Sequence, residues 1–530
     1  MLLEKIGFVD GFEIMRDSSY FPNCLLLSIW LLLSVPVLNS ASASTSSPPV
    51  DISPHSIAWG PGLDPSVVLP ARYFFIQAVD SSGQNYTASP GASALQLSID
   101  SLRGRCPIFQ ELLDRKDGTY LARYRLYEPC DGLQIAITTE NGQHVAGSPF
   151  VFEGKVMHAD CDCPVAAEKW KELSQCPLTY SQIDRDLEQF APSGKYNMSE
   201  VFEALSSRFH PQSACFCYYM IKNQRLYKKC FGEHVGFAMF MDQLILLLLR
   251  RTKLPDVEFV VNLGDYPLSA KYRKGNKMPV FSWCGADDHY DIVMPTYDVT
   301  ESSLHAMDRV SLDMLSVQAT QTPVWQEKIP KAFWRGRDAR EERLKLVQLG
   351  RNNSDLIDAG LTHFFFFRDQ ESLYGPTVPS VNFFQFFQYK YQLNLDGTVA
   401  AYRFPYLLAG DSLVFKQESA YYEHFYHDLQ PWTHYIPVRR DLDDLVEQLQ
   451  WARSHDEEAQ RIAKRGSDYA RENLLPVNVF CYYVLLFEKW SSMTVMNSYS
   501  ADDGFAAVPQ VPEKSGKCDC GNNIGFKEEL

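Results

Sequence analysis

The spacing of apolar residues changes near residue 160, and this change limits the folds open to the chain. Between residues 47 and 154, apolar and polar side chains alternate in short segments that are separated by turn residues such as Asp117-Gly118 and Asn141-Gly142. Alternation with a period of two and regularly spaced turns indicate an all-β immunoglobulin-like sandwich of about 100 residues. The expected strands include residues 67–69, 72–79, 120–126 and 133–138.

After Cys163, helical segments alternate with apolar strands. This rhythm predicts α/β layers around a largely parallel sheet, in a domain that we place at residues 161–494. The expected strands are residues 257–263, 280–283, 391–395 and 412–416, and the expected helices are residues 234–251 and two amphipathic helices within 442–475. Residues 495–530 are polar and rich in turn residues, so we interpret them as a tail.

Length and charge narrow the classes of function. A chain of 530 residues with 45% apolar content can bury a large core and is expected to form two to four domains. Its net charge of -15 argues against a nucleic-acid partner, because such partners select broadly basic surfaces.

The N-terminus has the pattern of a secretory signal peptide. Residues 24–38 are nearly all apolar, and Ala41-Ser42-Ala43 fits cleavage after Ala43, so residues 1–43 are assigned to the signal. The apolar run is shorter than the ~20 residues that a membrane helix needs, and the chain is therefore not expected to span a membrane. The acidic segment before it is a poor n-region, so a start at Met15 and a signal anchor both stay open as alternatives.

The C-terminus ends in Lys527-Glu528-Glu529-Leu530, which is similar to the Lys-Asp-Glu-Leu retrieval signal of the endoplasmic reticulum. A luminal location and a retrieval-signal receptor as partner are the expectations. Removal of Cys24 with the signal leaves an even number of cysteines, for which disulfides are the default in an oxidising lumen. The candidate N-glycosylation sites are Asn85, Asn197 and Asn352.

The arginines of residues 335–343 form a candidate anion site. Arg335, Arg337, Arg340 and Arg343 fall within nine residues, where an apolar strand is expected to pass into a helix. Planar guanidinium groups and the free N–H groups at a helix start suit a diphosphate. A solvated helix face is the alternative, because acidic residues are interleaved with the arginines at helical spacing.

Two further candidates directly follow expected strands, where open α/β sheets bind their ligands. Asp265 lies in a Gly-Pro turn after residues 257–263 and is a candidate general base, with an ordinary Asp turn as the alternative. Residues 394–403 predict a strand, a glycine turn and a helix whose first turn is made of small residues, which lets a phosphate approach. Arg403 is expected one or two helical turns further on, and a surface arginine is its alternative. The small residues of this loop are Gly397, Thr398, Val399, Ala400 and Ala401.

Within the sandwich region the chain resembles a filamin-type immunoglobulin-like repeat. The matching segments are Gly60-Pro61-Gly62-Leu63, Asp117-Gly118-Thr119-Tyr120, the Glu128-Pro129 kink and residues 142–150. The resemblance implies a module without chemistry of its own, whose expected role is spacing or binding, including binding of substrate proteins.

From residue 47 onward the chain resembles the protein O-glucosyltransferases of the capsule-associated glycosyltransferase family, especially the subgroup with a retrieval signal and an N-terminal filamin-type repeat. The likeness lies in residues 262–267, 333–343, 396–403 and 421–438. It implies a GT-B fold with two Rossmann-like lobes that transfers glucose from UDP-glucose to a serine of an epidermal growth factor-like (EGF-like) repeat, with inversion. The implied partners are secreted or membrane proteins that carry such repeats, as Notch-like proteins do.

The resemblance also implies roles for single residues. Asp265 matches the catalytic base, Arg343 and Arg403 match residues that hold the UDP diphosphate, and the turn at residues 397–402 matches the nucleotide-binding loop. Positive charge there would stabilise the UDP leaving group, so no metal and no other cofactor is expected.

Some observations depart from the family pattern or leave alternatives open. Glu342-Arg343-Leu344 lacks an Asp found in single-domain members, and Gly264 replaces a residue that is often basic in them. Asp287-Asp288-His289 could suggest a metal site, but the rest of the chain does not follow that pattern. UDP-xylose as donor and a non-catalytic luminal chaperone are the competing readings. Two disulfides are expected among Cys161, Cys163, Cys176 and Cys481, tying the start of the catalytic region to its last helix, and the sequence leaves their pairing open.

Overall fold

A computed structural model describes residues 51–191, 194–273, 277–319, 323–497 and 504–510, together with Cys518 and Cys520. The predicted signal peptide at residues 1–43 and the retrieval signal at 527–530 lie outside the described residues. No helix within the described ranges is both long and apolar enough to cross a membrane.

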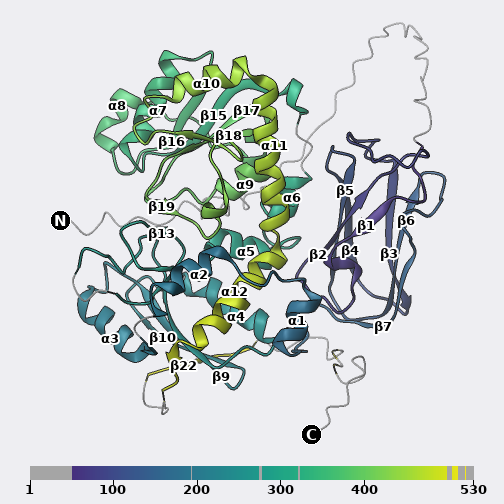
Figure 1. Cartoon of the computed structure of the whole chain (residues 1–530), viewed down its shortest axis with the longest axis horizontal. Coiled ribbons are helices and arrows are strands. Elements are labelled where there is room, and N and C mark those ends of the chain that lie inside the picture. The colour runs from purple at the N-terminus through teal and green to yellow at the C-terminus, as the bar shows by residue number, and fades with distance from the viewer. Residues whose placement is uncertain are drawn as a thin grey trace, which may run out of the picture. The chain divides into compact units, whose positions relative to one another are not determined.

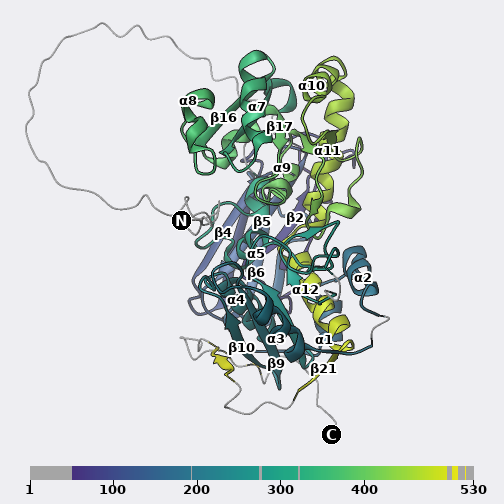
Figure 2. The same cartoon turned by 90° about the vertical axis from the view of Figure 1, so that its left-hand side faces the viewer.

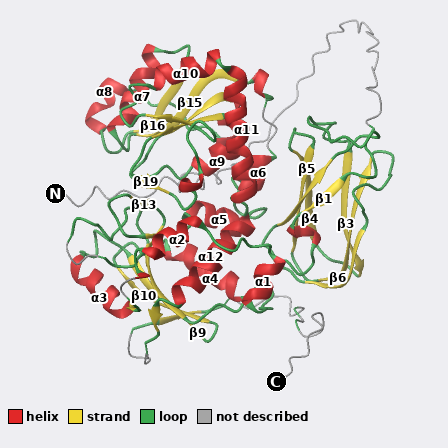
Figure 3. Ribbon diagram, in the orientation of Figure 1, coloured by secondary structure: helices red, strands yellow, loops and turns green. Residues whose placement is uncertain are grey.

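The strands of the N-terminal region form two antiparallel sheets, and Figure 3 shows their strands running side by side. Phe74 and Ile76 of one sheet and Ile135 and Ile137 of the other are fully buried in the core between them, which confirms the predicted sandwich. One sheet has the order β1 (Ile57–Trp59), β2 (Arg72–Gln77), β5 (Thr119–Leu126), β4 (Ile108–Asp114), and the other has the order β3 (Leu95–Arg103), β6 (Cys130–Thr139), β7 (Phe150–Val156).

The strand expected at residues 67–69 is wrong. Val67 and Leu69 are buried, but their segment forms no strand. Pro65 and Pro70 flank it, and a proline cannot donate a ladder hydrogen bond, so the two apolar side chains are buried from a loop instead.

The first α/β part is built on a six-stranded mixed sheet (Figure 1). Its strands, in spatial order, are β14 (Ile292–Val293), β12 (Phe281–Ser282), β11 (Val257–Asn262), β9 (Phe216–Lys222), β10 (Arg225–Phe231) and β22 (Ala506–Val508). Helices pack on it through contacts of α3 with β9 and β11, of α4 with β10 and of α12 with β11. The helices of this part are α1 (Ala167–Leu173), α2 (Ser181–Glu188), α3 (Met198–Arg208), α4 (Ala238–Leu249), α5 (Tyr297–His305) and α12 (Pro476–Ser491).

The second α/β part is built on a five-stranded parallel sheet with the order β16 (Ile357–His363), β15 (Ile329–Arg337), β17 (Tyr389–Asn394), β18 (Leu413–Gln417), β20 (Ile436–Val438). Helix α7 contacts β16, whereas α10 contacts β20 and α11 contacts β18, so these helices lie toward opposite edges of the sheet (Figure 2). The helices of this part are α7 (Glu341–Asn352), α8 (Glu371–Tyr374), α9 (Phe404–Ala409), α10 (Leu445–Ser454) and α11 (Asp456–Asn473), and α6 (Met314–Gln318) precedes β15.

The prediction of a largely parallel sheet is confirmed for the five-stranded sheet and is wrong for half of the six-stranded one. Strands β9 and β10 are antiparallel because a two-residue turn joins them. Its residues, Asn223 and Gln224, have φ of 49° and 60°, and such left-handed pairs form the tight turns of hairpins. The predicted helices at 234–251 and 442–475 appear as α4, α10 and α11.

The region after residue 495 carries structure, so its interpretation as a tail is wrong for the residues that the structure describes. Ala506–Val508 (β22) pairs with β10 at the edge of the six-stranded sheet, and Cys518 and Cys520 are disulfide-bonded. A three-residue edge strand is too short to give a recognisable sequence period.

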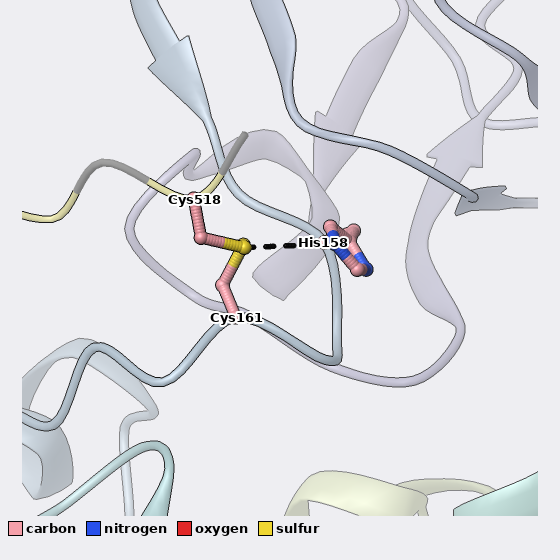
Figure 4. A group of neighbouring side chains, drawn as sticks. All are labelled: His158, Cys161 and Cys518. Carbon is pink, nitrogen blue, oxygen red and sulfur yellow. Dashed lines mark hydrogen bonds between the residues drawn. A yellow bond between two sulfur atoms is a disulfide. The ribbon is translucent and has the colours of Figure 1, made fainter. Parts of the chain in front are cut away.

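The disulfide expectation needs a correction. Cys176 bonds Cys481 in α12, but Cys161 and Cys163 bond Cys518 and Cys520, so only one disulfide forms among the four candidates. Figure 4 shows the Cys161–Cys518 bond beside His158. Two more bonds join Cys106 to Cys130 and Cys217 to Cys230, and the buried cysteines Cys215 and Cys284 are free thiols.

Candidate active site

Asp265 lies in the turn that follows β11, at the carboxyl end of the strand. The turn is held by Asn262, whose Nδ2 donates to the carbonyl oxygen of Tyr266 at 2.7 Å and whose Oδ1 accepts from the N–H of Gly264 at 2.9 Å. Because Asn262 is itself buried, the half-buried Asp265 has a fixed place at the sheet edge. This is the position that the strand-end argument predicts.

Arg335 and Arg337 are the last arginines of β15. Arg335 forms an ion pair with Asp358 of β16 at 2.7 Å and lies over the ring of Phe333. The carbonyl oxygen of Arg337 accepts from Nη1 of Arg343 at 3.0 Å. Both arginines belong to the end of β15, the strand that pairs with β17.

Arg343 is buried and holds the predicted nucleotide loop in place. Its Nε donates to the carbonyl oxygen of Asp396 at 2.8 Å, and its Nη2 donates to that of Leu395 at 3.3 Å. A Cβ on Gly397 would come within 3.2 Å of Nη2, so the glycine allows this close approach. Arg343 therefore joins α7 to the loop through backbone carbonyls.

Arg340 is the functional candidate that the sequence analysis left without a role. Its Nε donates to the carbonyl oxygen of Gly397 at 2.6 Å, and its Nη2 donates to that of Thr398 at 2.8 Å, so its charge lies at the same loop as that of Arg343. Arg340 also lies over the ring of Tyr421. The spacing of Arg340 and Arg343, one turn apart at the start of α7, was the available signal that both could reach one loop.

The helix expected after Gly397 begins later than predicted. Residues 397–401, including Val399, Ala400 and Ala401, form a bent loop, and α9 begins at Phe404. Arg403 is the residue just before the helix rather than one or two turns inside it, and its Nη1 donates to the carbonyl oxygen of Arg335 at 2.7 Å. Pro405 was the missed signal, because proline is tolerated only in the first turn of a helix.

The base candidate and the loop lie within electrostatic reach of each other. Burial raises the pKa of Tyr402 well above its usual value, and the neighbouring Cys284 and Asp265 raise it further. Burial also raises the pKa of the Cys284 thiol, and the backbone of Ala400 in the loop opposes that rise. Asp265, from the six-stranded part, is thus near enough to act on the pKa of Tyr402, which follows a loop of the five-stranded part.

A short strand pair joins the two parts beside this loop. Gly285–Ala286 (β13) pairs with Tyr421–Tyr422 (β19) in antiparallel register. The ring of Tyr421 lies 6.5 Å from that of Tyr266. Tyr266 directly follows Asp265 in the sequence, so β19 lies close to the proposed base. The arrangement gathers a carboxylate, a loop held by two arginines and two tyrosines at one place.

Two groups of side chains in the described part of the chain are of the kinds that bind metal ions. Asp288 pairs with His289 at 2.7 Å, which is an ordinary contact between adjacent residues. Within the described part of the chain, His158, Cys161 and Cys518 are grouped closely enough to hold an ion (Figure 4). The two sulfurs are bonded to each other, so they are not the thiolates that a metal binds.

The sequons differ in accessibility. Asn85 and Asn352 are exposed, as an acceptor for a glycan must be. Asn197 instead caps α3, because its Oδ1 accepts from the N–H of Ser199 at 3.1 Å.

The fold and the site define a class: an immunoglobulin-like sandwich followed by two α/β sheets, with Asp265 in a strand-end turn and a loop that two arginines hold. Residues 49–151 match the family described as Filamin/ABP280 repeat, and residues 171–514 match Glycosyl transferase family 90. The chain belongs to glycosyl transferase family 90 and carries an N-terminal filamin repeat.

Similar proteins extend over most of the chain. Protein O-glucosyltransferase 2 of Danio rerio is 51% identical over 88% of this chain and 92% of its own length. Protein O-glucosyltransferase 3 of Homo sapiens is 44% identical over 96% of this chain and 99% of its own length. Protein O-glucosyltransferase 1 of Homo sapiens is 30% identical over 63% of this chain and 88% of its own length.

Proposed function

We propose that this chain is an inverting protein O-glucosyltransferase that moves glucose from UDP-glucose to a serine of EGF-like repeats. The relatives named protein O-glucosyltransferase support the transferred sugar and the protein acceptor. The observation that carries the proposal is the reach of the Asp265 carboxylate to Tyr402, in a loop that Arg340 and Arg343 hold.

Asp265 is the proposed base. In the transfer, its carboxylate accepts the proton of the serine hydroxyl while the serine oxygen forms a bond to the anomeric carbon. The bond from that carbon to the UDP oxygen breaks in the same displacement, and UDP leaves with the bonding electrons. A single displacement inverts the anomeric carbon and requires one base, and we assign that role to Asp265.

The diphosphate is proposed to lie on the loop after β17. Backbone N–H groups of residues 397–401 are suited to it. So is the positive charge around the loop, which comes from Arg335, Arg337, Arg340, Arg343 and Arg403. Arg343 donates to loop carbonyls, so it acts by shaping the loop and by its charge. We propose that these cations stabilise the leaving UDP without a metal or other cofactor.

The wider setting of the enzyme is part of the same proposal. A GT-B arrangement of two lobes is supported by the two α/β sheets, with Asp265 beside one and the loop beside the other. An endoplasmic reticulum location, clients with EGF-like repeats and capture by a retrieval-signal receptor are supported by the apolar N-terminal run, the Lys-Glu-Glu-Leu terminus and the disulfides.

The test compares the wild-type chain with Asp265→Asn. Both are incubated with folded EGF-like repeats and either UDP-glucose or UDP-xylose, and the products are weighed by mass spectrometry. We expect a hexose gain with wild type and a rate about 10²–10⁴-fold lower with Asp265→Asn, since the amide cannot accept the proton. UDP affinity should persist in the variant. A pentose gain would change the donor, and unchanged rates would contradict the base assignment.

A further inference from the structure

Several buried polar atoms near the predicted nucleotide loop have no hydrogen-bond partner among the residues that the structure describes, Oδ1 of Asn394 at the end of β17 included. Three others are Nε1 of Trp283, the hydroxyl of Tyr402 and Oε2 of Glu423. Trp283 and Glu423 are fully buried, and Tyr402 is 9% exposed. Buried polar groups are almost always paired in folded proteins, so three orphans in one neighbourhood point to a polar ligand.

The three residues come from separate segments and converge. The ring of Tyr297 makes edge contacts with Trp283 at 5.8 Å and with Tyr402 at 5.4 Å, so it lies between them. Glu423 accepts from the hydroxyl of Tyr426, and the ring of Tyr426 lies 5.2 Å from that of Phe404, which begins α9 two residues after Tyr402. One orphan therefore belongs to the six-stranded part, and two belong to the five-stranded part.

The chemistry of the three atoms is complementary to a sugar. The indole N–H of Trp283 is a donor, and the phenol of Tyr402 can donate or accept. Burial raises the pKa of Glu423 well above its usual value, so Glu423 is a neutral carboxyl group that can donate or accept. Its Oε1 already accepts from the Tyr426 hydroxyl at 3.2 Å, which fixes the carboxyl group and leaves Oε2 for a ligand hydroxyl. A ring with adjacent hydroxyl groups meets all three requirements.

The position of the orphans favours the transferred sugar over the ribose of the nucleotide. Trp283 lies two residues before β13, which pairs with β19, and the ring of Tyr421 in β19 lies 6.5 Å from that of Tyr266, the residue after the proposed base Asp265. The anomeric carbon has to lie between that base and the diphosphate loop, and Tyr402 directly follows the loop. The orphaned atoms thus lie on the side where the reacting sugar must be.

We propose that Trp283, Tyr402 and Glu423 form the subsite that binds the hydroxyl groups of the transferred hexose. The proposal rests on the proposed function, because it assumes a UDP-sugar donor. Glu423 is the specificity-determining acceptor in this subsite, and Trp283 and Tyr402 supply the donors.

The test measures binding of UDP and of UDP-glucose to the full chain by calorimetry. The variants are Glu423→Gln, which replaces a carboxyl oxygen by an NH₂ group that cannot accept, and Tyr402→Phe, which keeps the ring and removes only the hydroxyl. We expect UDP-glucose affinity to fall about 10–100-fold for Glu423→Gln and about 3–10-fold for Tyr402→Phe. UDP affinity should change less than about twofold.

Glu418→Gln is the matched control, because Glu418 lies on the same segment and is exposed; it should bind both ligands as wild type does. Equal losses of UDP and UDP-glucose affinity in both subsite variants would overturn the proposal, since they would place the residues at the ribose or in the loop's fold. Tyr402→Phe serves if Glu423→Gln does not fold. A wild-type chain that binds UDP-glucose but transfers no sugar would contradict the proposed function, while the variant pattern would still decide the subsite.

Discussion

Arg343 and Arg340 hold one loop, but they differ in burial. Arg343 is 1% exposed and donates to three backbone carbonyls, whereas Arg340 is partly exposed and donates to two. A lysine cannot reproduce the planar fork of a buried guanidinium. We therefore assign Arg343 chiefly to stability and Arg340 chiefly to donor binding.

The first prediction separates these roles. Arg343→Lys should lower the free energy of unfolding by about 2–3 kcal/mol, because it leaves buried carbonyls without donors. Arg340→Lys should lower it by less than about 1 kcal/mol and should raise KM for UDP-glucose. Urea unfolding and steady-state kinetics measure the two effects. Equal losses of stability in both variants would contradict the assignment.

His424 carries the pH prediction. Burial against the rings of Phe425 and Tyr482 lowers the pKa of His424 to about 3. In the unfolded chain His424 takes up a proton near pH 6.5, whereas in the folded chain it does so only near pH 3. The free energy of unfolding therefore falls as the pH falls from 6.5 toward 3. His424→Phe removes this uptake and should reduce the loss of stability between pH 7 and pH 5 by about 2 kcal/mol.

Urea unfolding at pH 7 and pH 5 tests this. His55→Gln, at an exposed histidine, is the control and should keep the wild-type loss. A His424→Phe chain that loses as much stability as wild type on acidification would show that the residue does not resist protonation in the folded state.

Among the elements, the pairing of β13 with β19 has the most direct consequence for the site. A Cβ on Gly285 would overlap the ring of Tyr422 and the side chain of Val293. Gly285 therefore permits the two strands to approach, and β19 carries Tyr421 next to Arg340.

Gly285→Ala should displace β19 and with it Tyr421. We expect kcat/KM for UDP-glucose to fall about tenfold or more, because small displacements at a reacting site are costly. Gly504→Ala, in an exposed turn with φ of 78°, offers a glycine control whose strain lies away from the site. Unchanged kinetics in Gly285→Ala would mean that β19 does not position the site.

On the scale of the whole molecule, the sandwich is fixed to the enzyme by specific contacts. Residues from Ile52 onward form one compact unit. Arg471 of α11 contacts Asp117 of the sandwich at 3.2 Å and Asp411 at 2.8 Å, and Arg123 of β5 contacts Ser316 of α6 at 2.9 Å. The filamin repeat therefore contacts the α/β region through specific polar side chains. The sequence predicted a spacing or binding role for the repeat but not these contacts.

Arg471→Ala tests this contact. The side chain of Arg471 is 5% exposed, but those of its partners Asp117 and Asp411 are 34% and 44% exposed. We therefore expect the free energy of unfolding to fall by about 1–2 kcal/mol, which is less than the cost of breaking a fully buried ion pair. Arg453→Ala breaks an exposed pair with Asp355 and should lose less than about 0.5 kcal/mol. Urea unfolding and limited proteolysis between the sandwich and α1 measure the effect. Equal losses in the two variants would argue against a structural role of Arg471 at the contact.

Sequence patterns predicted much of the architecture and the position of Asp265. They failed where a signal was short or where partners were distant. The three residues of β22 are too few to show a period, and Pro405 outweighed the small residues that suggested a helix at 398.

By itself, the sequence determined the sandwich, the α/β alternation and the strand-end turn of Asp265, because periodicity and turn chemistry act between near neighbours. Only the tertiary structure decided that Cys161 bonds Cys518, 357 residues away, and that Arg340 and Arg343 donate to the loop after β17. It also decided that Trp283, Tyr402 and Glu423, from three separate segments, lie in one neighbourhood. The physical reason is that such pairings depend on which atoms the packed core brings within bonding distance, and no local pattern encodes that choice.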